Sequence, residues 1–332
     1  MARTVLFHEV GGPEVMRLED VEPGEPGPGE VLIRVDAIGV NRAEALFRGG
    51  HYIEPVRRFP GRLGAEAAGV VEAVGPGVTG LEAGQAVSSV PAFSQNDYAV
   101  YAERAVVPAS ALVPRPDGLD AVSGAAVWMP YLTAYGALVE VGGMRPGDAV
   151  VLTAASSGVG LAAIHTANRV GATPIAVTRT GGKKERLLKE GAAHVIVSDE
   201  EDVAARVLEL TGGRGAEYVF DAVAGPGVTG LARAVAPGGT LFLYGALSGQ
   251  PTPYPGFDLG MPALNMRTYT VLETIRDPRR LERAVAFVAS GLRSGAFRPV
   301  VDRTFPLEEV VEAHRYMESG SQIGKIVLTV DH

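Results

Sequence analysis

A run of small residues at 153–160 has the composition of a loop that binds phosphate. It follows the apolar run 149–152, and it precedes a helical pattern that Gly171 ends and a second strand-like run at 173–178. Small side chains allow the backbone N–H groups at the start of a helix to approach an anion. The order strand, loop, helix, glycine and strand within about 30 residues is typical of a dinucleotide-binding unit.

The glycine signature of such a unit is imperfect in this chain. Its three glycine positions are filled by Ala155, Ser157 and Gly160. A lone glycine motif is a weak signal, so the prediction depends on the strands and the helix around it. The alternative is an ordinary α/β crossover that binds nothing.

The residues after the second strand indicate which nicotinamide cofactor the unit binds. NAD enzymes end this strand with an acid that accepts a hydrogen bond from the ribose 2′-hydroxyl. Here Thr178 and Arg179 stand at the strand end, and the next acid is Glu185. A 2′-phosphate would meet Arg179 and Lys183, and two hydrogen bonds to a charged group favour NADPH by about 10²-fold or more. The alternative is a solvated helix face.

The composition describes a globular protein and excludes several classes of site. Of the 332 residues 46% are apolar, and the net charge of −8 argues against a nucleic-acid-binding surface. The chain has no cysteine, which removes disulfides, thiolate nucleophiles and thiolate metal sites. No apolar run approaches the ~18–20 residues that span a bilayer, and the first residues lead into a strand rather than a signal peptide. We expect a cytoplasmic protein that binds neither nucleic acid nor membrane.

Two kinds of pattern divide the chain. The first part is β-rich, and its short strands are punctuated by Gly and Pro. Asn41 begins a short helix within it that runs to about Arg48. The stretches with strand character are 2–10, 31–40, 64–90 and 98–107.

From Asp148 strands and helices alternate, which predicts a doubly wound parallel sheet. An Arg-rich amphipathic helix follows from about Asp277, and the strand-like run 325–330 is expected to return to the first domain. The predicted domains are 1–123 with 273–332, and 124–272. The expected strands are 149–152, 173–178, 193–197, 216–221, 240–245 and 267–272, with helices over 183–190 and 200–210.

Several short segments, spread from near the N-terminus to the last ten residues, have the spacing of one known superfamily. They are 28–35, 39–44, 64–71, 131–136, 145–148, 154–160, 236–239 and 324–325. With them the chain resembles the medium-chain dehydrogenase/reductase superfamily, and within it the zinc-free quinone oxidoreductases and related enone or enoyl reductases. The resemblance implies an α/β protein with a GroES-like catalytic domain, a Rossmann cofactor domain, a cleft between them and a homodimer.

The resemblance also bears on metal binding. Zinc-dependent relatives place a cysteine where this chain has Asn41, and a His–Glu pair where it has Ala65 and Glu66. A catalytic zinc needs about three protein ligands, and none of the six histidines shows ligand spacing with another. We therefore expect no metal. Without a Lewis acid, reducing an electron-poor alkene or quinone is easier than oxidising an unactivated alcohol.

Two residues are expected to act on the substrate. Tyr52 matches a tyrosine of the quinone reductases, and its phenol stays protonated at neutral pH and can donate a proton. The alternative is a tyrosine that only shapes the pocket wall. Asn41 matches an asparagine beside nicotinamide and substrate, whose amide can donate to a carbonyl oxygen. It also has the residue type of a helix N-cap, and both roles can hold together.

Further cofactor contacts are implied by the resemblance, each with scaffold packing as its alternative. Thr133 and the strand end at 244–247 should border the nicotinamide and its ribose, and Lys325 should reach the cofactor from the C-terminal strand. The residues expected to face the pyrophosphate are Ser156, Ser157, Gly158, Val159 and Gly160. Those expected at the strand end are Tyr244, Gly245, Ala246 and Leu247.

The sequence thus predicts a zinc-independent oxidoreductase that transfers hydride from NADPH to a quinone or an α,β-unsaturated carbonyl compound, leaving NADP⁺. One alternative is an enoyl-thioester reductase, for which Arg57, Arg58 and Arg62 are the only hint of a path for a CoA arm. Another alternative, of a different class, is a nucleotide-binding structural or regulatory protein without turnover.

Overall fold

The computed structural model describes the whole chain, Met1 to His332, which divides into two compact units. The first comprises residues 1–129 and 299–332, and the second comprises residues 130–298. The N- and C-terminal parts of the chain therefore fold together, and the second unit is inserted between them. These boundaries differ from the predicted ones at 123/124 and 272/273.

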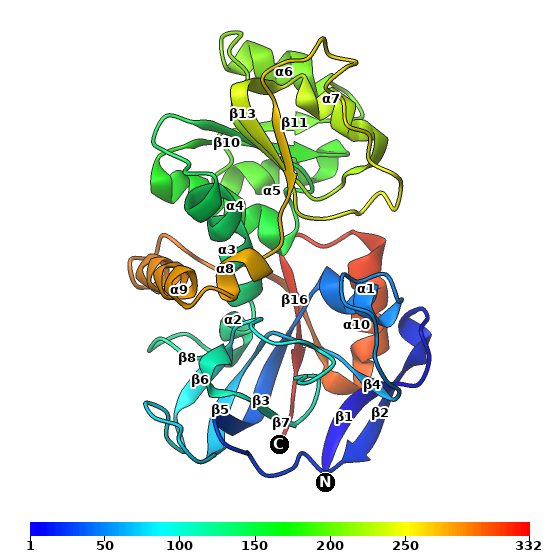
Figure 1. Cartoon of the computed structure of the whole chain (residues 1–332), viewed down its shortest axis with the longest axis vertical. Coiled ribbons are helices and arrows are strands. Elements are labelled where there is room, and N and C mark those ends of the chain that lie inside the picture. Colours follow the sequence, from blue (N-terminus) through cyan, green and yellow to red (C-terminus); the bar gives the residue numbers. More distant parts are fainter. The chain divides into compact units, whose positions relative to one another are not determined.

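The first unit is built around a long central strand, β3 (Glu30–Val40), which pairs with β5, β7 and β16 (Figure 1). Alternate residues in its first half, Val31, Ile33 and Val35, are fully buried, as expected for a strand with one face on a core. The remaining strands of this unit are β1 (Ala2–Phe7), β2 (Met16–Val21), β4 (Gly61–Arg62), β5 (Ala67–Val74), β6 (Ala86–Ser89), β7 (Arg104–Pro108), β8 (Leu112–Pro114), β15 (Val301–Pro306) and β16 (Lys325–Thr329).

Strand β16 confirms the predicted return of the C-terminus. It runs antiparallel to β3, with Val327 opposite Gly39 and Ile326 opposite Val40. This register places Lys325 near the end of β3, where the helix α1 begins. The helices of this unit are α1 (Arg42–Arg48), α2 (Ala121–Gly124) and α10 (Val310–Ser319).

The second unit is a six-stranded parallel sheet in the order β11-β10-β9-β12-β13-β14. Strand β9 is buried along its whole length, because a parallel sheet is covered on both faces. The order reverses between β9 and β12, and ligands of doubly wound sheets bind at such a switch point. The strands are β9 (Ala149–Leu152), β10 (Thr173–Thr178), β11 (His194–Val197), β12 (Ala216–Asp221), β13 (Val235–Leu243) and β14 (Asn265–Thr268).

Along the chain, helices alternate with the strands of this sheet from β9 to β13, as predicted. The turn after β9 leads into α4, which ends at Gly171 in the left-handed conformation (φ +90°). Strand β14 begins two residues before the predicted sixth strand and ends at Thr268. The helices are α4 (Gly158–Val170), α5 (Lys184–Lys189), α6 (Val203–Leu210), α7 (Val228–Ala232), α8 (Leu272–Ile275) and α9 (Pro278–Arg293), and α3 (Trp128–Tyr135) crosses the boundary between units.

Helix α9 explains the difference in the second domain boundary. The prediction assigned it to the first domain, but its apolar face packs within the second unit. Phe287 lies 4.7 Å, between ring centroids, from Tyr135, and Arg169 donates a hydrogen bond of 2.8 Å to Ser290. The amphipathic pattern had predicted a helix with one buried face, but the pattern itself does not identify the surface that covers it.

One helical stretch, Ala121–Val141, has the length and apolar composition of a membrane span. In the structure 83% of its most apolar window is buried inside the protein, as in the core helix of a globular fold.

Candidate active site

The expected site residues fall in both units. Asn41, Tyr52 and Lys325 belong to the first unit, and the expected cofactor contacts from Thr133 to Leu247 belong to the second. Asn41 precedes α1, Lys325 begins β16, Tyr52 lies in the loop between α1 and β4, and Thr133 lies within α3.

The turn between β9 and α4 has the geometry of an anion site. Ser157 is the N-cap of α4, and its hydroxyl accepts a hydrogen bond of 3.1 Å from the Gly160 N–H. A Cβ at Gly160 would lie 2.5 Å from the Ala155 carbonyl oxygen, so only glycine lets the helix start this close to the turn. The other N–H groups of the first turn have no partner within the helix and can bind an anion.

Two cations of the second unit, Arg179 and Lys183, follow β10 in the chain. Lys183 extends its ammonium to within 3.1 Å of the Ser156 hydroxyl, next to the N-terminus of α4. Arg179 is exposed, and Gly182 has nothing within 4 Å of an ideal Cβ. A carboxylate oxygen of Glu200 lies 3.6 Å from an ideal Cβ on Gly181. The donors at this strand end suit a phosphate next to a pyrophosphate, as NADPH would require.

Asp221 and Thr153 were not among the predicted site residues. Asp221 ends β12 and is fully buried; its carboxylate accepts hydrogen bonds from the Thr153 hydroxyl (2.5 Å) and from the N–H groups of Val223 and Ala224. The Thr153 hydroxyl in turn accepts from the Ala222 N–H at 2.9 Å. These bonds fix the loops after β9 and β12 at the switch point of the sheet. The only sign of this role in the sequence was an acidic residue, Asp221, at the end of a predicted strand.

The remaining expected contacts of the second unit range from buried to exposed. Tyr244 follows β13 and stacks on Phe220 with ring centroids 3.9 Å apart. Burial, and secondarily the charge of Asp221, raise the pKa of its phenol well above the ordinary value, so it stays protonated. Thr133 on α3 is buried, whereas Leu247 is 46% exposed.

In the first unit Asn41 is the N-cap of α1, as predicted, but its side chain is used differently from an ordinary cap. Its backbone N–H donates to the Glu44 carboxylate at 2.7 Å, and its Nδ2 donates to the Gly39 carbonyl at 3.0 Å. Its Oδ1 accepts a hydrogen bond from the Lys325 ammonium. Lys325, expected to reach the cofactor, is here 4% exposed and also donates to Glu66 at 2.6 Å.

Glu66 and Glu44 complete this buried polar cluster. Neither side chain is exposed to solvent. One oxygen of Glu66 accepts from the backbone N–H of Met129 at 2.9 Å, while the other accepts from Lys325. Burial raises the pKa of Glu44 to about 7, and the Lys325 ammonium opposes this shift only in part.

The loop that carries Tyr52 is anchored by neighbouring residues. The ring of Tyr52 packs edge-on against Phe47, with centroids 6.3 Å apart. The residues after it are tied to the segment 94–97, which restricts their motion. The hydrogen bonds join Glu54 to Ser94 (2.6 Å), the Arg57 N–H to Asn96 (2.9 Å) and Asn96 to the Pro55 carbonyl (3.0 Å).

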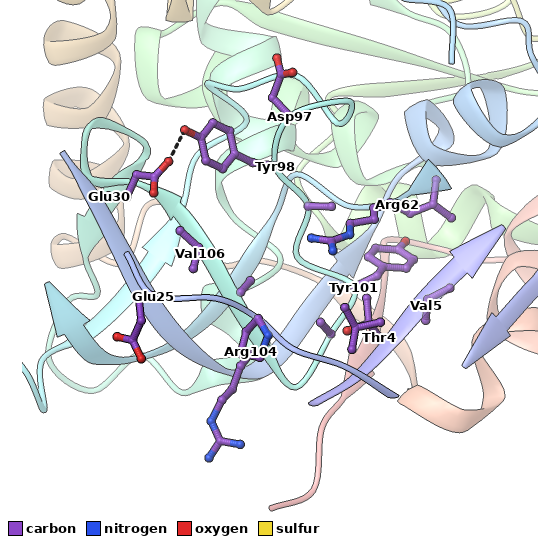
Figure 2. Close-up of a pocket in the computed structure, with 16 residues that line it drawn as sticks. Thr4, Val5, Glu25, Glu30, Arg62, Asp97, Tyr98, Tyr101, Arg104 and Val106 are labelled. Atoms are coloured by element: carbon purple, nitrogen blue, oxygen red, sulfur yellow. Dashed lines mark hydrogen bonds between the residues drawn. The ribbon is translucent and has the colours of Figure 1, made fainter. Parts of the chain in front are cut away.

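A cavity of the first unit is separate from these residues. It has a volume of about 240 Å³, and its wall includes Tyr98, whose hydroxyl donates a hydrogen bond of 2.6 Å to Glu30 (Figure 2). Asn41, Tyr52 and Lys325 do not line it. The structure also brings together no group of three or more His, Asp or Glu side chains that could hold a metal ion.

The raised pKa of Glu44 predicts a pH-dependent stability. Between pH 4.5 and about 7 the native state holds a proton on Glu44 that the unfolded chain has released, so stability falls as pH rises through this window. The loss is on the order of 3 kcal/mol. Urea unfolding at several pH values should show a smaller fall for Glu44→Gln than for the wild type. The exposed control Glu82→Gln should match the wild type; an unchanged slope in Glu44→Gln would refute the prediction.

Two family models match the chain. The alcohol dehydrogenase GroES-like domain matches residues 27–117, and the zinc-binding dehydrogenase model matches residues 190–328. The chain is 33% identical over 332 residues to a quinone oxidoreductase of Pseudomonas aeruginosa, and the match covers 99% of each chain. It is also 33% identical over 335 residues to a 2-haloacrylate reductase of a Burkholderia species, with 99% of each chain covered.

A solved structure shows the same architecture. The Escherichia coli quinone oxidoreductase complexed with NADPH superposes with a TM-score of 0.90 at 29% identity, covering 99% of this chain and 100% of that one. These comparisons confirm the predicted fold class, a GroES-like domain with a Rossmann-type parallel-sheet domain. The chain belongs to the quinone oxidoreductase family of the medium-chain dehydrogenase/reductase superfamily.

Proposed function

We propose that this protein reduces quinones or α,β-unsaturated carbonyl compounds with NADPH and without zinc. The observation that carries the cofactor assignment is the pair of cations at the end of β10, where Lys183 lies 3.1 Å from Ser156 and no acid takes the place of a ribose-binding carboxylate. The names of the relatives, quinone oxidoreductase and 2-haloacrylate reductase, support the substrate class.

When bound, NADPH would supply a hydride from C4 of its nicotinamide to the electrophilic carbon of the substrate. The residues of the chain would bind the cofactor and donate the proton that completes the reduction. The turn at 156–160 would hold the pyrophosphate at the N-terminus of α4, and Arg179 with Lys183 would hold the 2′-phosphate. Tyr52 would donate a proton to the substrate, and Asn41 would donate a hydrogen bond to its carbonyl oxygen.

The experiment that tests this function is NADPH oxidation against a panel of electron-poor acceptors. The panel contains benzoquinone, phenanthrenequinone, an alkenal, 2-chloroacrylate and crotonyl-CoA, with NADH and EDTA controls. Turnover of a free quinone or enone that EDTA does not change is the expected result. Turnover of crotonyl-CoA alone would instead assign an enoyl-thioester reductase. NADPH binding without any turnover would support the non-enzymatic alternative.

Replacing Tyr52 with phenylalanine tests its role as proton donor. We expect kcat for the best acceptor to fall by about 10²-fold, because general acid catalysis contributes at least this much when the donor is positioned. Titration of NADPH should show an unchanged Kd. Tyr98→Phe is the matched control, since that hydroxyl bonds Glu30 away from the site. Full kcat in Tyr52→Phe would show that the proton comes from water or another group.

We further propose that the protein is a homodimer that uses the outer strand of the parallel sheet. Strand β14 pairs only with β13, so its other edge presents unpaired backbone groups. The chain before it exposes Tyr254 (60%), Phe257 (79%) and Met261 (73%), an unusual amount of apolar surface for a monomer.

Sedimentation velocity tests the homodimer. The wild type should sediment as a species of twice the chain mass of 34.6 kDa. The double variant Phe257→Asp, Met261→Asp should sediment as a species of the chain mass. Val10→Asp, at an exposed apolar residue of the first unit, is the control and should remain dimeric. A monomeric wild type, or a double variant that stays dimeric, would contradict this assignment.

A further inference from the structure

We propose that Lys325, held by Glu66, is a positioning residue that fixes the orientation of the Asn41 amide. This inference deepens the proposed function, because it explains how Asn41 would be presented to the substrate. It differs from the contact with the cofactor that the sequence predicted for Lys325. Its structural part stands on the contacts of the first unit alone.

The partners around Asn41 admit one orientation of its amide. An ammonium can only donate hydrogen bonds, so the atom that faces Lys325 must be Oδ1. The Gly39 carbonyl can only accept, so the atom 3.0 Å from it must be Nδ2. A flipped amide would place two donors against each other and two acceptors against each other. Lys325 and Gly39 therefore act together as a lock on the amide.

Lys325 is itself held rigidly. Glu66 accepts its second hydrogen bond at 2.6 Å and is anchored by the Met129 N–H at 2.9 Å. The packing leaves no room for a side chain at Gly39, because a Cβ there would lie 2.7 Å from Glu66 Oε2 and 2.9 Å from Lys325 Cε. Since Lys325 is 4% exposed, water has little access to replace it.

This arrangement leaves one donor of Asn41 for a ligand. One Nδ2 hydrogen is used by Gly39, whereas the other faces only long contacts of 3.4 Å to Glu66 and 3.5 Å to Glu44. Contacts of this length are weak hydrogen bonds. The second hydrogen, fixed in the plane of the amide, is therefore the one left to donate to a carbonyl oxygen of the substrate or the nicotinamide, while Lys325 prevents the amide from flipping.

Side-chain amide resonances test the lock without any catalysis. The chain contains only four asparagines, residues 41, 96, 168 and 265, so ¹⁵N-asparagine labelling gives four amide pairs that single Asn→Asp variants assign. In Lys325→Met the Asn41 pair should move and the other three should stay. Arg48→Met is the matched control, because Arg48 is also a buried cation of the first unit but contacts Gly11 and Glu318. It should leave the Asn41 pair in place.

Kinetics then connect the lock to function. In Lys325→Met we expect kcat/KM for the best acceptor to fall by about 10- to 100-fold, as for a misplaced catalytic group, with the Kd for NADPH within about twofold of the wild type. Lys325→Arg, which keeps the charge and the donors, should recover part of the loss. If Lys325→Met does not fold, the double variant Lys325→Met, Glu66→Gln removes both buried charges and gives the same readouts.

Two results would overturn the inference. One is an Asn41 amide pair that does not move when Lys325 is replaced. The other is a rise of tenfold or more in the Kd for NADPH with kcat unchanged, which would indicate that Lys325 contacts the cofactor. A wild type that turns over no acceptor would refute the proposed function, whereas the spectra would still decide the positioning role of Lys325.

Discussion

Replacing Arg179 and Lys183 together with alanine is expected to weaken NADPH binding by about 10²-fold and to leave NADH binding unchanged. The two cofactors differ only in the 2′-phosphate, so a loss confined to NADPH identifies the groups that bind that phosphate. The Lys183 ammonium already lies beside the first turn of α4, and the Arg179 side chain is exposed at the end of β10. Titration of both cofactors by quenching of protein fluorescence measures the two Kd values.

The control for this prediction lies in the following helix. Lys184 and Lys189 are exposed lysines of α5. Their double alanine variant removes two positive charges, the same number as the test variant. It should leave both Kd values near the wild type if the effect is local. Equal weakening of NADPH and NADH by Arg179→Ala, Lys183→Ala would contradict the assignment. Glu200→Gln, which removes a carboxylate near Gly181, should strengthen NADPH binding slightly.

Replacing Glu66 with alanine is expected to destabilise the first unit by about 3–5 kcal/mol, the usual consequence of leaving one member of a buried ion pair without its partner. Lys325 would keep a buried charge, and the Met129 N–H would lose its acceptor. Urea unfolding followed by fluorescence measures this loss, because the single tryptophan, Trp128, is buried in the first unit.

A matched variant separates this effect from the removal of any carboxylate. Glu72 pairs with Arg104 on the surface, where both side chains are about one-third exposed. Glu72→Ala should therefore cost at most about 1 kcal/mol. If Glu66→Ala lowers the free energy of unfolding no more than Glu72→Ala does, Lys325 and Glu66 do not form a buried ion pair.

The sequence predicted the dinucleotide-binding unit well because its signals are local. An unbroken apolar run predicted β9. Helix α4 ends at Val170 and strand β10 ends at Thr178, as the sequence predicted. Gly171 ends α4 because its positive φ disfavours other residues. Such features depend on neighbours in the chain, so a sequence pattern is enough to place them.

The cluster around Asn41 depends on contacts that no local pattern encodes. Lys325 and Asn41 are 284 positions apart, and they meet only because β16 pairs with β3 in one particular register. The resemblance predicted a cofactor contact for Lys325, but not that Lys325 and Glu66 would pair. The hydrogen bonds of Asp221 and Thr153 were missed for the same reason, since the two residues are 68 positions apart and meet only because β12 pairs with β9.

NADPH that carries deuterium at C4 of the nicotinamide tests the proposed hydride transfer most directly. With a quinone or enone accepted by the enzyme, we expect NADPH deuterated on the transferred face to be oxidised more slowly. For an enone, the product should also carry the label on the carbon β to the carbonyl, equally with and without EDTA. An enone product without deuterium from either labelled face, or turnover abolished by EDTA and restored by zinc, would contradict a zinc-independent hydride transfer from NADPH.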